Sequence, residues 1–595
     1  MMKVFGANIT HQVLDYLNDS LRNMVSVEEA NSKLFQSFGV IQFFDNEEDL
    51  QILKESISIS QSIVLDPDRA EYGDFQTNIE LANNIALHLT TKDISPEIII
   101  EPTCGKGNFI VASLKYFNGV KKIYGIEIYK PYVWESKFNI LDFYLKNPNE
   151  NNTKHNLPEV SIIHTSIFDF DFKNIAKENN TKKILIIGNP PWVTNAKLGS
   201  LNSSNLPKKT NFKNHNGLDA ITGKGNFDIA EYITLMMVET FQNQNGNIAL
   251  LVKNAVIKNI VFDQINNKYH ISDLEKYLID SKKEFNVSVE ASLFYCKLNS
   301  NPTFWCTEFD FYNNSDVKSN FGWATDKFVS NLDNYSDSIQ IDGKCPFEWR
   351  QGIKHDCSSI MELELVNGCF VNGLKEEVSL ESDLVYGILK SSDLKNTIIN
   401  QTRKHTIITQ KKVGQETDYI KYNFPKTYKY LSEHQDIFNA RKSSIYNNKP
   451  PFSIFGVGEY SFKPYKVAIS GLYKTYHFTL ILPQNQKPVM LDDTCYMLGF
   501  DKLEFAVYSH ILLNAKITTK LLQSITFADA KRTFTKDVLR RIDLLALAEI
   551  IDKSELKKEL DYINQTYNFN LTLDYWDDFM NEMKPIERIQ MELFA

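Results

Sequence analysis

The chain has 595 residues, of which 43% are hydrophobic and 23% charged, a composition typical of an ordinary soluble globular protein. This length exceeds what one hydrophobic core usually holds, so two or more domains are expected. The net charge of −9 neither indicates nor excludes a nucleic-acid partner, because only the surface that meets phosphate must be positive.

Seven cysteines are scattered along the chain without a Cys-x-x-Cys pair. This favours free thiols in a reducing cytoplasm and argues against a disulfide framework or a metal site. The first residues lack the continuous apolar run of a signal peptide, and no stretch approaches the roughly 20 apolar residues of a membrane helix. We therefore expect a cytoplasmic protein with no metal and no membrane association.

Three regions follow one another in the chain. Residues 1–70 show helical periodicity with mixed charge and predict a helical N-terminal extension. From 71 to 335, short β-type runs alternate with helical stretches, which predicts an α/β domain with a mostly parallel sheet. Residues 336–595 change to short strands and turns, then to helical segments from about residue 500, and predict a separate α+β domain.

The run IIIEPTCGKGNFI contains the first candidate ligand site. A buried strand, 98–100, leads into Glu101 and a turn with Gly105 and Gly107, and a helix follows from Asn108. Such a turn lets a ligand approach the backbone in front of a helix N-terminus. It is not a Walker loop, because the required GK[ST] is absent. Taken alone, it leaves a cofactor site and an ordinary turn equally open.

The next run, KKIYGIE, ends in Glu127, about twenty residues after the glycines. An acidic side chain at this place can accept hydrogen bonds from both ribose hydroxyls of a nucleoside cofactor. A solvated surface glutamate is the alternative.

The hydrophobic run KKILIIGNPPW stops abruptly at Asn189, Pro190, Pro191 and Trp192. Two prolines fix two φ angles and remove two backbone donors, so this segment is rigid and cannot continue a strand. Asn189 and Trp192 are thereby expected at the C-terminal edge of the sheet, where open α/β sheets bind ligands. The two earlier signals disfavour an incidental Pro-Pro turn.

These segments together resemble the gamma class of DNA adenine-N6 methyltransferases. NPPW resembles the catalytic motif of that class, EPTCGKG resembles its cofactor loop, and the upstream EYGDFQT (71–77) resembles the motif that closes over the methionine end of the cofactor. Farther along, WRQGIKHDCS, YGILKSSDL and TRKHTIITQKKVG resemble the target-recognition domain fused to such enzymes in Type II restriction-modification systems.

The resemblance implies a Rossmann-like domain that uses S-adenosylmethionine, and methyl transfer to adenine N6 in double-stranded DNA within a restriction-modification or related phage-defence system. Its cofactor residues here are Thr77, Glu101, Thr103, Gly105 and Gly107 near the methionine end, Glu127 at the ribose, and Ile167 with either Ser166 or Asp169 at the adenine. Asn78 stands where the family often has proline, and it should still begin a helix because asparagine is a good N-cap.

The same resemblance implies roles around the target base. The Asn189 side-chain oxygen and the Pro190 carbonyl would accept hydrogen bonds from the adenine amine, in the rigid frame that Pro191 completes. Trp192 would stack on a flipped base, with Phe285 on the other face. Plain core packing is the alternative for Phe285.

Basic residues suggest where DNA would bind. Lys208, Lys209, Lys213 and Lys224 lie in a polar loop, 195–226, that follows the catalytic motif. Basic and aromatic residues also interleave in the C-terminal region, at 402–412, 424–431, 440–446, 460–466 and 527–536. Several such clusters favour contact with phosphates, although each alone is usually a solvated face.

No nuclease motif is found, so a separate endonuclease or defence partner is expected, and a monomer or weak dimer suffices. The alternatives are an RNA or protein methyltransferase, a cytosine-N4 DNA methyltransferase, and a specificity subunit without activity.

Overall fold

The computed structural model describes residues 2–58, 76–148, 157–193, 228–287, 289–527 and 532–584. The chain divides into two compact units, residues 1–328 and 329–595. This division falls seven residues before the boundary predicted after residue 335.

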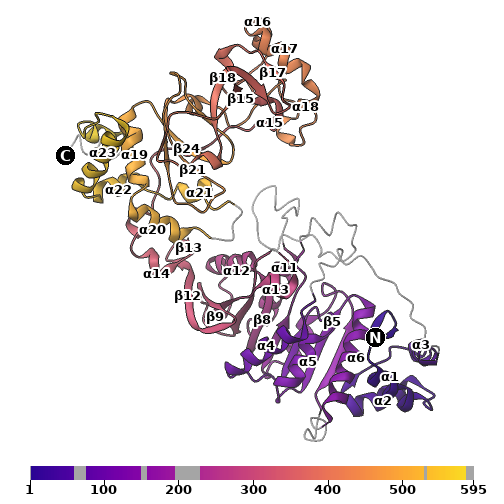
Figure 1. Cartoon of the computed structure of the whole chain (residues 1–595). Coiled ribbons are helices and arrows are strands. Elements are labelled where there is room, and N and C mark those ends of the chain that lie inside the picture. Colours follow the sequence, from indigo (N-terminus) through magenta and orange to yellow (C-terminus); the bar gives the residue numbers. More distant parts are fainter. Residues whose placement is uncertain are drawn as a thin grey trace. The chain divides into compact units, whose positions relative to one another are not determined.

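An eleven-stranded sheet forms the centre of the first unit, in the order β13-β12-β11-β9-β10-β8-β7-β4-β5-β6-β3 (Figure 1). Its strands are β3 (Val40–Ile41), β4 (Ile98–Glu101), β5 (Lys122–Glu127), β6 (Glu159–His164), β7 (Ile184–Gly188), β8 (Gly246–Lys253), β9 (Ile271–Leu278), β10 (Ala291–Leu298), β11 (Trp305–Asp310), β12 (Asn313–Ala324) and β13 (Lys327–Val329). The six strands from β3 to β8 run parallel, and β10 is antiparallel to both of its neighbours. The predicted α/β class is confirmed.

Helices pack in two series against this sheet. The first series is α4 (Ile79–Thr91), α5 (Asn108–Tyr116) and α6 (Lys130–Lys146), and the second is α8 (Phe172–Glu178), α11 (Ile229–Phe241) and α12 (Asn254–Asn267). The strand order reverses between β4 and β7, so right-handed crossovers place the two series on opposite faces. Burial on both faces explains why β4 and β7 are hydrophobic throughout.

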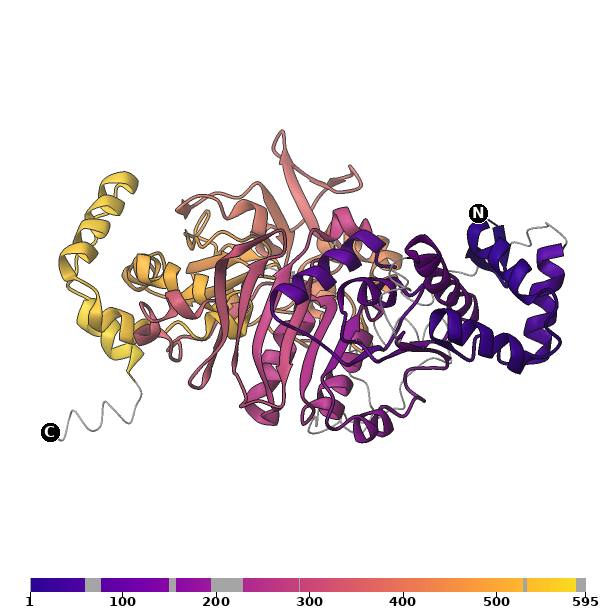
Figure 2. The ribbon, with the colours of Figure 1, turned by 90° about the horizontal axis from the view of Figure 1, so that it is seen from below.

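The N-terminal extension contains the expected helices, α1 (His11–Leu21), α2 (Val27–Phe38) and α3 (Glu47–Ser58). In Figure 2 these indigo helices gather at one end of the sheet. The extension also contains a hairpin of β1 (Met2–Val4) and β2 (Ala7–Ile9), and its β3 pairs with β6 as the outermost strand. Strands of two or three residues carry no readable periodicity, so the sequence did not reveal them.

The second unit contains two further sheets, ordered β14-β24-β21-β22-β19 and β17-β16-β15-β20-β18-β23. Their strands are β14 (Arg350–Gln351), β15 (Glu362–Val366), β16 (Cys369–Asn372), β17 (Glu377–Val378), β18 (Val385–Leu389), β19 (Ile398–Ile399), β20 (Lys404–Ile407), β21 (Tyr465–Ser470), β22 (Thr479–Ile481), β23 (Met490–Leu491) and β24 (Cys495–Phe500).

Helices accompany these sheets in three groups. Two short ones, α14 (Leu332–Tyr335) and α15 (Ser358–Met361), come first, and α16 (Tyr419–Asn423), α17 (Pro425–Glu433) and α18 (Gln435–Asn439) follow β20. The C-terminal group is α19 (Leu503–Leu513), α20 (Lys516–Ile525), α21 (Lys536–Leu539), α22 (Leu544–Ile550), α23 (Lys553–Tyr567) and α24 (Trp576–Met583). Within the described part of the chain, no helix is both long and apolar enough to cross a membrane.

Candidate active site

Three neighbouring parallel strands bring the predicted site residues to one edge of the sheet. β4 lies between β5 and β7, and the strands end at Glu101, Glu127 and Gly188. Because the carboxyl ends of parallel strands meet at the same edge, the glycine turn and the Asn-Pro-Pro-Trp segment emerge side by side. The site is therefore assembled by strand order, from segments up to a hundred residues apart.

The glycine turn after β4 adopts a backbone that favours glycine at two positions. Gly105 has φ of 51° and Gly107 has φ of 76°, both in the left-handed region. A Cβ atom on Gly105 would lie 2.4 Å from Gln76 Oε1, and one on Gly107 would lie 2.3 Å from Ser136 Oγ. Side chains therefore pack closely against the turn at both glycines, which are buried.

Glu127 is bonded to this turn. Its Oε2 accepts a hydrogen bond from the Gly105 amide at 2.8 Å, and its Oε1 accepts one from the Tyr129 amide at 2.7 Å. The alternative of a merely solvated surface glutamate is therefore wrong.

Glu101 is an acid held in a buried position. It is 2% exposed, and burial together with the negative charge of Glu127 raises the pKa of its carboxyl well above the usual value. Among the residues that the structure describes, Oε2 of Glu101 has no hydrogen-bond partner. A buried oxygen in this state is suited to accept from a cationic ligand group, which would satisfy its hydrogen bonding and its charge at once.

A pocket at this edge is lined by Gln76, Thr77, Glu101, Thr103, Cys104, Asn108, Phe109 and Asn189. It brings together four residues that the sequence predicted, and four that it missed. Gln76 Oε1 accepts from the Lys106 amide at 3.2 Å, and Asn108 Nδ2 donates to the Thr77 carbonyl at 2.7 Å. Both missed amides are next to predicted residues in the quoted motifs, and that adjacency was the available signal.

Asn189 is held from two directions. Its Nδ2 donates to Thr77 Oγ1 at 3.2 Å, and its carbonyl accepts from Thr103 Oγ1 at 3.4 Å. With the amide nitrogen directed to Thr77, the side-chain oxygen is on the opposite side of the amide group. Asn78, the next residue after Thr77, is the N-cap of α4, with Oδ1 accepting from the Leu81 amide at 2.7 Å. The prediction that asparagine would begin this helix is confirmed.

Trp192 and Phe285 contact each other. Trp192 is 6% exposed, and its indole N–H donates to the Leu251 carbonyl at 3.2 Å. Phe285 is the last residue of the short helix α13 (Ser281–Phe285), and the two ring centroids are 4.9 Å apart at 68°, an edge-to-face arrangement. A base between two rings needs about 3.5 Å on each side. The rings must therefore separate before a base can stack between them.

The residues expected at the adenine of a cofactor follow β6. Ile167 is buried, and Ser166 Oγ accepts from the Phe168 amide at 3.2 Å. Asp169 is exposed. None of the three lines the pocket, so the choice between Ser166 and Asp169 stays a prediction.

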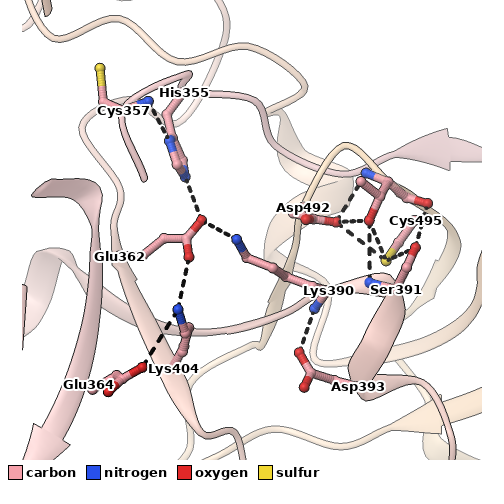
Figure 3. Close-up of polar contacts among 11 residues, drawn as sticks. His355, Cys357, Glu362, Glu364, Lys390, Ser391, Asp393, Lys404, Asp492 and Cys495 are labelled. Atoms are coloured by element: carbon pink, nitrogen blue, oxygen red, sulfur yellow. Dashed lines mark hydrogen bonds and ion pairs between the residues drawn. The ribbon is translucent and has the colours of Figure 1, made fainter. Parts of the chain in front are cut away.

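The second unit contains a polar network on a buried acid, Glu362, at the start of β15 (Figure 3). Its carboxylate is 2.6 Å from Lys390 Nζ, 3.6 Å from Lys404 Nζ and 3.7 Å from His355 Nε2. These three partners come from the three segments WRQGIKHDCS, YGILKSSDL and TRKHTIITQKKVG.

His355 is uncharged in this network. Burial lowers the pKa of its imidazole, and Nδ1 accepts from the Cys357 amide at 3.1 Å. The ring proton is therefore on Nε2, directed to Glu362. The side chains of Lys390 and Lys404 remain about one-third exposed.

In one predicted basic cluster, Lys466 is not available for a phosphate contact. Lys466, in cluster 460–466, is fully buried, its pKa is lowered by burial to about 7, and it donates to the Lys463 carbonyl at 2.6 Å. Lys463 forms an ion pair with Asp501. In cluster 440–446, the Arg441 guanidinium lies 3.7 Å from the centre of the Tyr446 ring. Outside the described residues lie 71–75, the whole polar loop 195–226 with its four lysines, and 528–531.

Comparison with known proteins identifies a family whose sequence model matches the part of the chain that contains this site. The model of the family N-6 DNA Methylase matches residues 67–285. The chain is 40% identical over 495 residues to the Type II methyltransferase M.NspV of Nostoc sp., a match that covers 81% of this chain and 98% of that protein.

Solved structures resemble the chain more distantly. The Type IIL restriction-modification enzyme MmeI in complex with DNA is 11% identical, with a TM-score of 0.49, over 90% of this chain and 84% of that one. The M protein of the Type I restriction enzyme EcoKI is 12% identical, with a TM-score of 0.27, over 51% and 60%.

The parallel sheet, the glycine turn and the motif after β7 define an α/β enzyme of the methyltransferase class. The chain belongs to the N-6 DNA methylase family. It is similar to a Type II methyltransferase over nearly the full length of that protein.

Proposed function

We propose that the chain transfers a methyl group from S-adenosylmethionine to adenine N6 at a specific sequence of double-stranded DNA, as the modification enzyme of a restriction-modification system. The observation that carries the proposal is the placement of Asn189, which is hydrogen-bonded to Thr77 and Thr103 at the rim of the pocket that contains Glu101. Family membership supports the reaction, and the residue roles below are our assignments.

The residues around the glycine turn fit S-adenosylmethionine. When bound, this cofactor supplies an electrophilic methyl group on a sulfonium. Glu101 would accept from the cationic ammonium of its methionine part, which pairs the buried acid with a charge. Glu127, at the end of the neighbouring strand and bonded to the Gly105 amide, would receive the ribose hydroxyls.

Asn189 and Pro190 would act on the target amine. The nitrogen lone pair of an adenine amine is delocalised into the ring, so the amine is a poor nucleophile. Hydrogen bonds from its two N–H groups to the Asn189 side-chain oxygen and the Pro190 carbonyl would favour a tetrahedral nitrogen and free the lone pair for in-line attack. Positioning and electrostatics carry this step.

The target base must leave the helix to reach this edge. Trp192 and Phe285 would hold it between their faces after their rings separate.

The second unit would read the DNA sequence. Lys390 and Lys404 would contact phosphate, held in place by Glu362. Exposed lysines in other predicted clusters, such as Lys426 and Lys429, would add to this surface. A separate endonuclease and a monomeric or weakly dimeric enzyme complete the proposal.

Labelled methyl transfer tests this function directly. The purified chain is incubated with methyl-labelled S-adenosylmethionine and unmethylated duplex DNA, and the product nucleosides are separated. We expect label in N6-methyladenine, and sequencing of the modified sites gives the recognition sequence. Label in N4-methylcytosine, RNA or protein would overturn the substrate, and an Asn189→Ala variant as active as the wild type would overturn the site.

A further inference from the structure

A closed series of contacts connects the pocket with the two aromatic rings. Asn189 bonds to Thr77, and the neighbouring Asn78 donates from Nδ2 to Glu284 Oε2 at 3.1 Å. Glu284 precedes Phe285, whose ring contacts Trp192. Trp192 leads back to Asn189 through the two prolines. We name these six residues the contact series: Thr77, Asn78, Asn189, Trp192, Glu284 and Phe285.

Glu284 is a member of the contact series that has no role assigned above. Its side chain is only 10% exposed, and both carboxylate oxygens are used. Oε2 accepts from Asn78, and Oε1 accepts from the Tyr312 hydroxyl at 2.9 Å. Lys283 Nζ lies 3.8 Å away. Two donors from separate segments therefore determine where Glu284, and with it the end of α13, can lie.

The helix that carries Phe285 is short, and its C-terminal end is closed by the Asn286 amide, which donates to the Ser281 and Lys282 carbonyls. α13 is only five residues long, and Asn286, the residue that follows it, has φ of 55°. Helices this short are marginal by themselves and depend on tertiary contacts. The hydrogen bonds of Glu284 are such contacts, one residue before the aromatic side chain.

The side chain of Asn78 makes two hydrogen bonds, and only one of them is within the contact series. Its Oδ1 caps α4, while its Nδ2 reaches Glu284. A proline at this position can begin a helix but has no side-chain donor. The amide of Asn78 therefore does something that helix initiation does not require.

We propose that Glu284 is a positioning residue that couples the cofactor pocket to the stacking position of Phe285. Because Trp192 and Phe285 are in contact, a base enters when the rings separate; a shift of α13 separates them, and the Asn78–Glu284 bond ties that shift to the segment carrying Thr77. Occupation of the pocket beside Thr77 fixes this segment and, through Glu284, fixes Phe285 for base capture. Coupling of this kind is reciprocal, so base capture strengthens cofactor binding equally. The inference rests on the proposed function.

Fluorescence of a base analogue tests the coupling. A duplex containing the mapped methylation site, with 2-aminopurine replacing the target adenine, brightens when that base leaves the stack. The full chain is titrated onto it with and without S-adenosylhomocysteine. For the wild type we expect S-adenosylhomocysteine to tighten capture about fivefold or more, the lower end of ordinary coupling.

Asn78→Ser and Glu284→Gln should abolish most of this coupling. Serine keeps the helix cap but does not reach Glu284, so Asn78→Ser should bind S-adenosylhomocysteine alone as the wild type does while the factor falls toward one. Tyr312→Phe removes the other donor and should reduce the factor partly. The matched control is Glu239→Gln: Glu239 also accepts from a tyrosine hydroxyl, Tyr269, at 3.3 Å, near the end of α11 and at the opposite edge of the sheet.

The possible outcomes separate the inference from the function. Wild-type coupling in Asn78→Ser and Tyr312→Phe overturns the inference while methyl transfer stands, and so does a wild type with no coupling. A wild type that methylates no DNA overturns the proposed function first. If Glu284→Gln does not fold, the Asn78→Ser and Tyr312→Phe variants still decide the question.

Discussion

Glu127 accepts a hydrogen bond from the backbone amide of Gly105 at 2.8 Å, across two neighbouring strand ends. The acid at the end of β5 thus holds the turn after β4 in shape. A single side chain supports the glycine turn and, in the proposed function, also contacts the ribose. Its removal should therefore affect cofactor binding in two ways.

Glu127→Ala should weaken S-adenosylmethionine binding by about 1–3 kcal/mol, the cost of leaving polar partners unpaired. Isothermal titration measures the dissociation constant. Glu159→Ala is a matched control, because Glu159 is an acid at the opposite end of the adjacent strand β6. Equal dissociation constants for Glu127→Ala and the control would show that the ribose site lies elsewhere.

Asn189→Ala should abolish methyl transfer, because the target amine loses its side-chain acceptor. Binding of S-adenosylmethionine should stay within a few-fold of the wild type, since the side-chain role that we assign to Asn189 is toward the target amine and Thr77 itself is kept. Asn189→Asp keeps an acceptor oxygen and should retain part of the rate. Single-turnover transfer assays compare the three proteins, and a fully active alanine variant would remove Asn189 from the mechanism.

Binding of S-adenosylmethionine should strengthen as pH rises. Burial and Glu127 raise the pKa of the Glu101 carboxyl, so the free protein keeps it protonated over a range where a free glutamate is ionised. The ammonium of the cofactor favours the ionised form, so binding releases a proton, and affinity rises by up to about tenfold per pH unit in that range.

Titration calorimetry in buffers of different ionisation enthalpy measures this proton release. Glu101→Gln, which cannot ionise, should show no release and no rise in affinity with pH. If the wild type behaves like this variant, the ammonium does not lie beside Glu101.

Lys390→Ala combined with Lys404→Ala should weaken DNA binding and flatten its dependence on salt, because each lysine would neutralise one phosphate. Binding of S-adenosylmethionine should be unchanged. Lys557→Ala, an exposed lysine on α23, is the control for loss of charge. Fluorescence anisotropy at several salt concentrations gives the slope, and an unchanged slope in the double variant would exclude these lysines from the DNA surface.

The sequence predicted the part of the site that is built from strand ends. Glu101, Glu127 and Asn189 each follow a recognisable hydrophobic run, and parallel strands bring such ends together. It could not predict contacts between distant segments. The Asn78–Glu284 hydrogen bond joins residues 206 apart, and nothing local in either segment indicates it. Burial of individual charges was equally hidden, since Lys466 is in the buried strand β21 and is also the last residue of the basic and aromatic segment 460–466.

The pairing of β3 with β6 has a consequence for synthesis of the chain. Val40 lies beside Val160, so the first strand of the sheet is made 120 residues before its partner. At about 5–20 residues per second, the ribosome needs on the order of ten seconds to reach that partner. The N-terminal extension is therefore synthesised before β3 can pair with β6. If synthesis stops within this interval, β3 has no partner strand and the extension stays undocked.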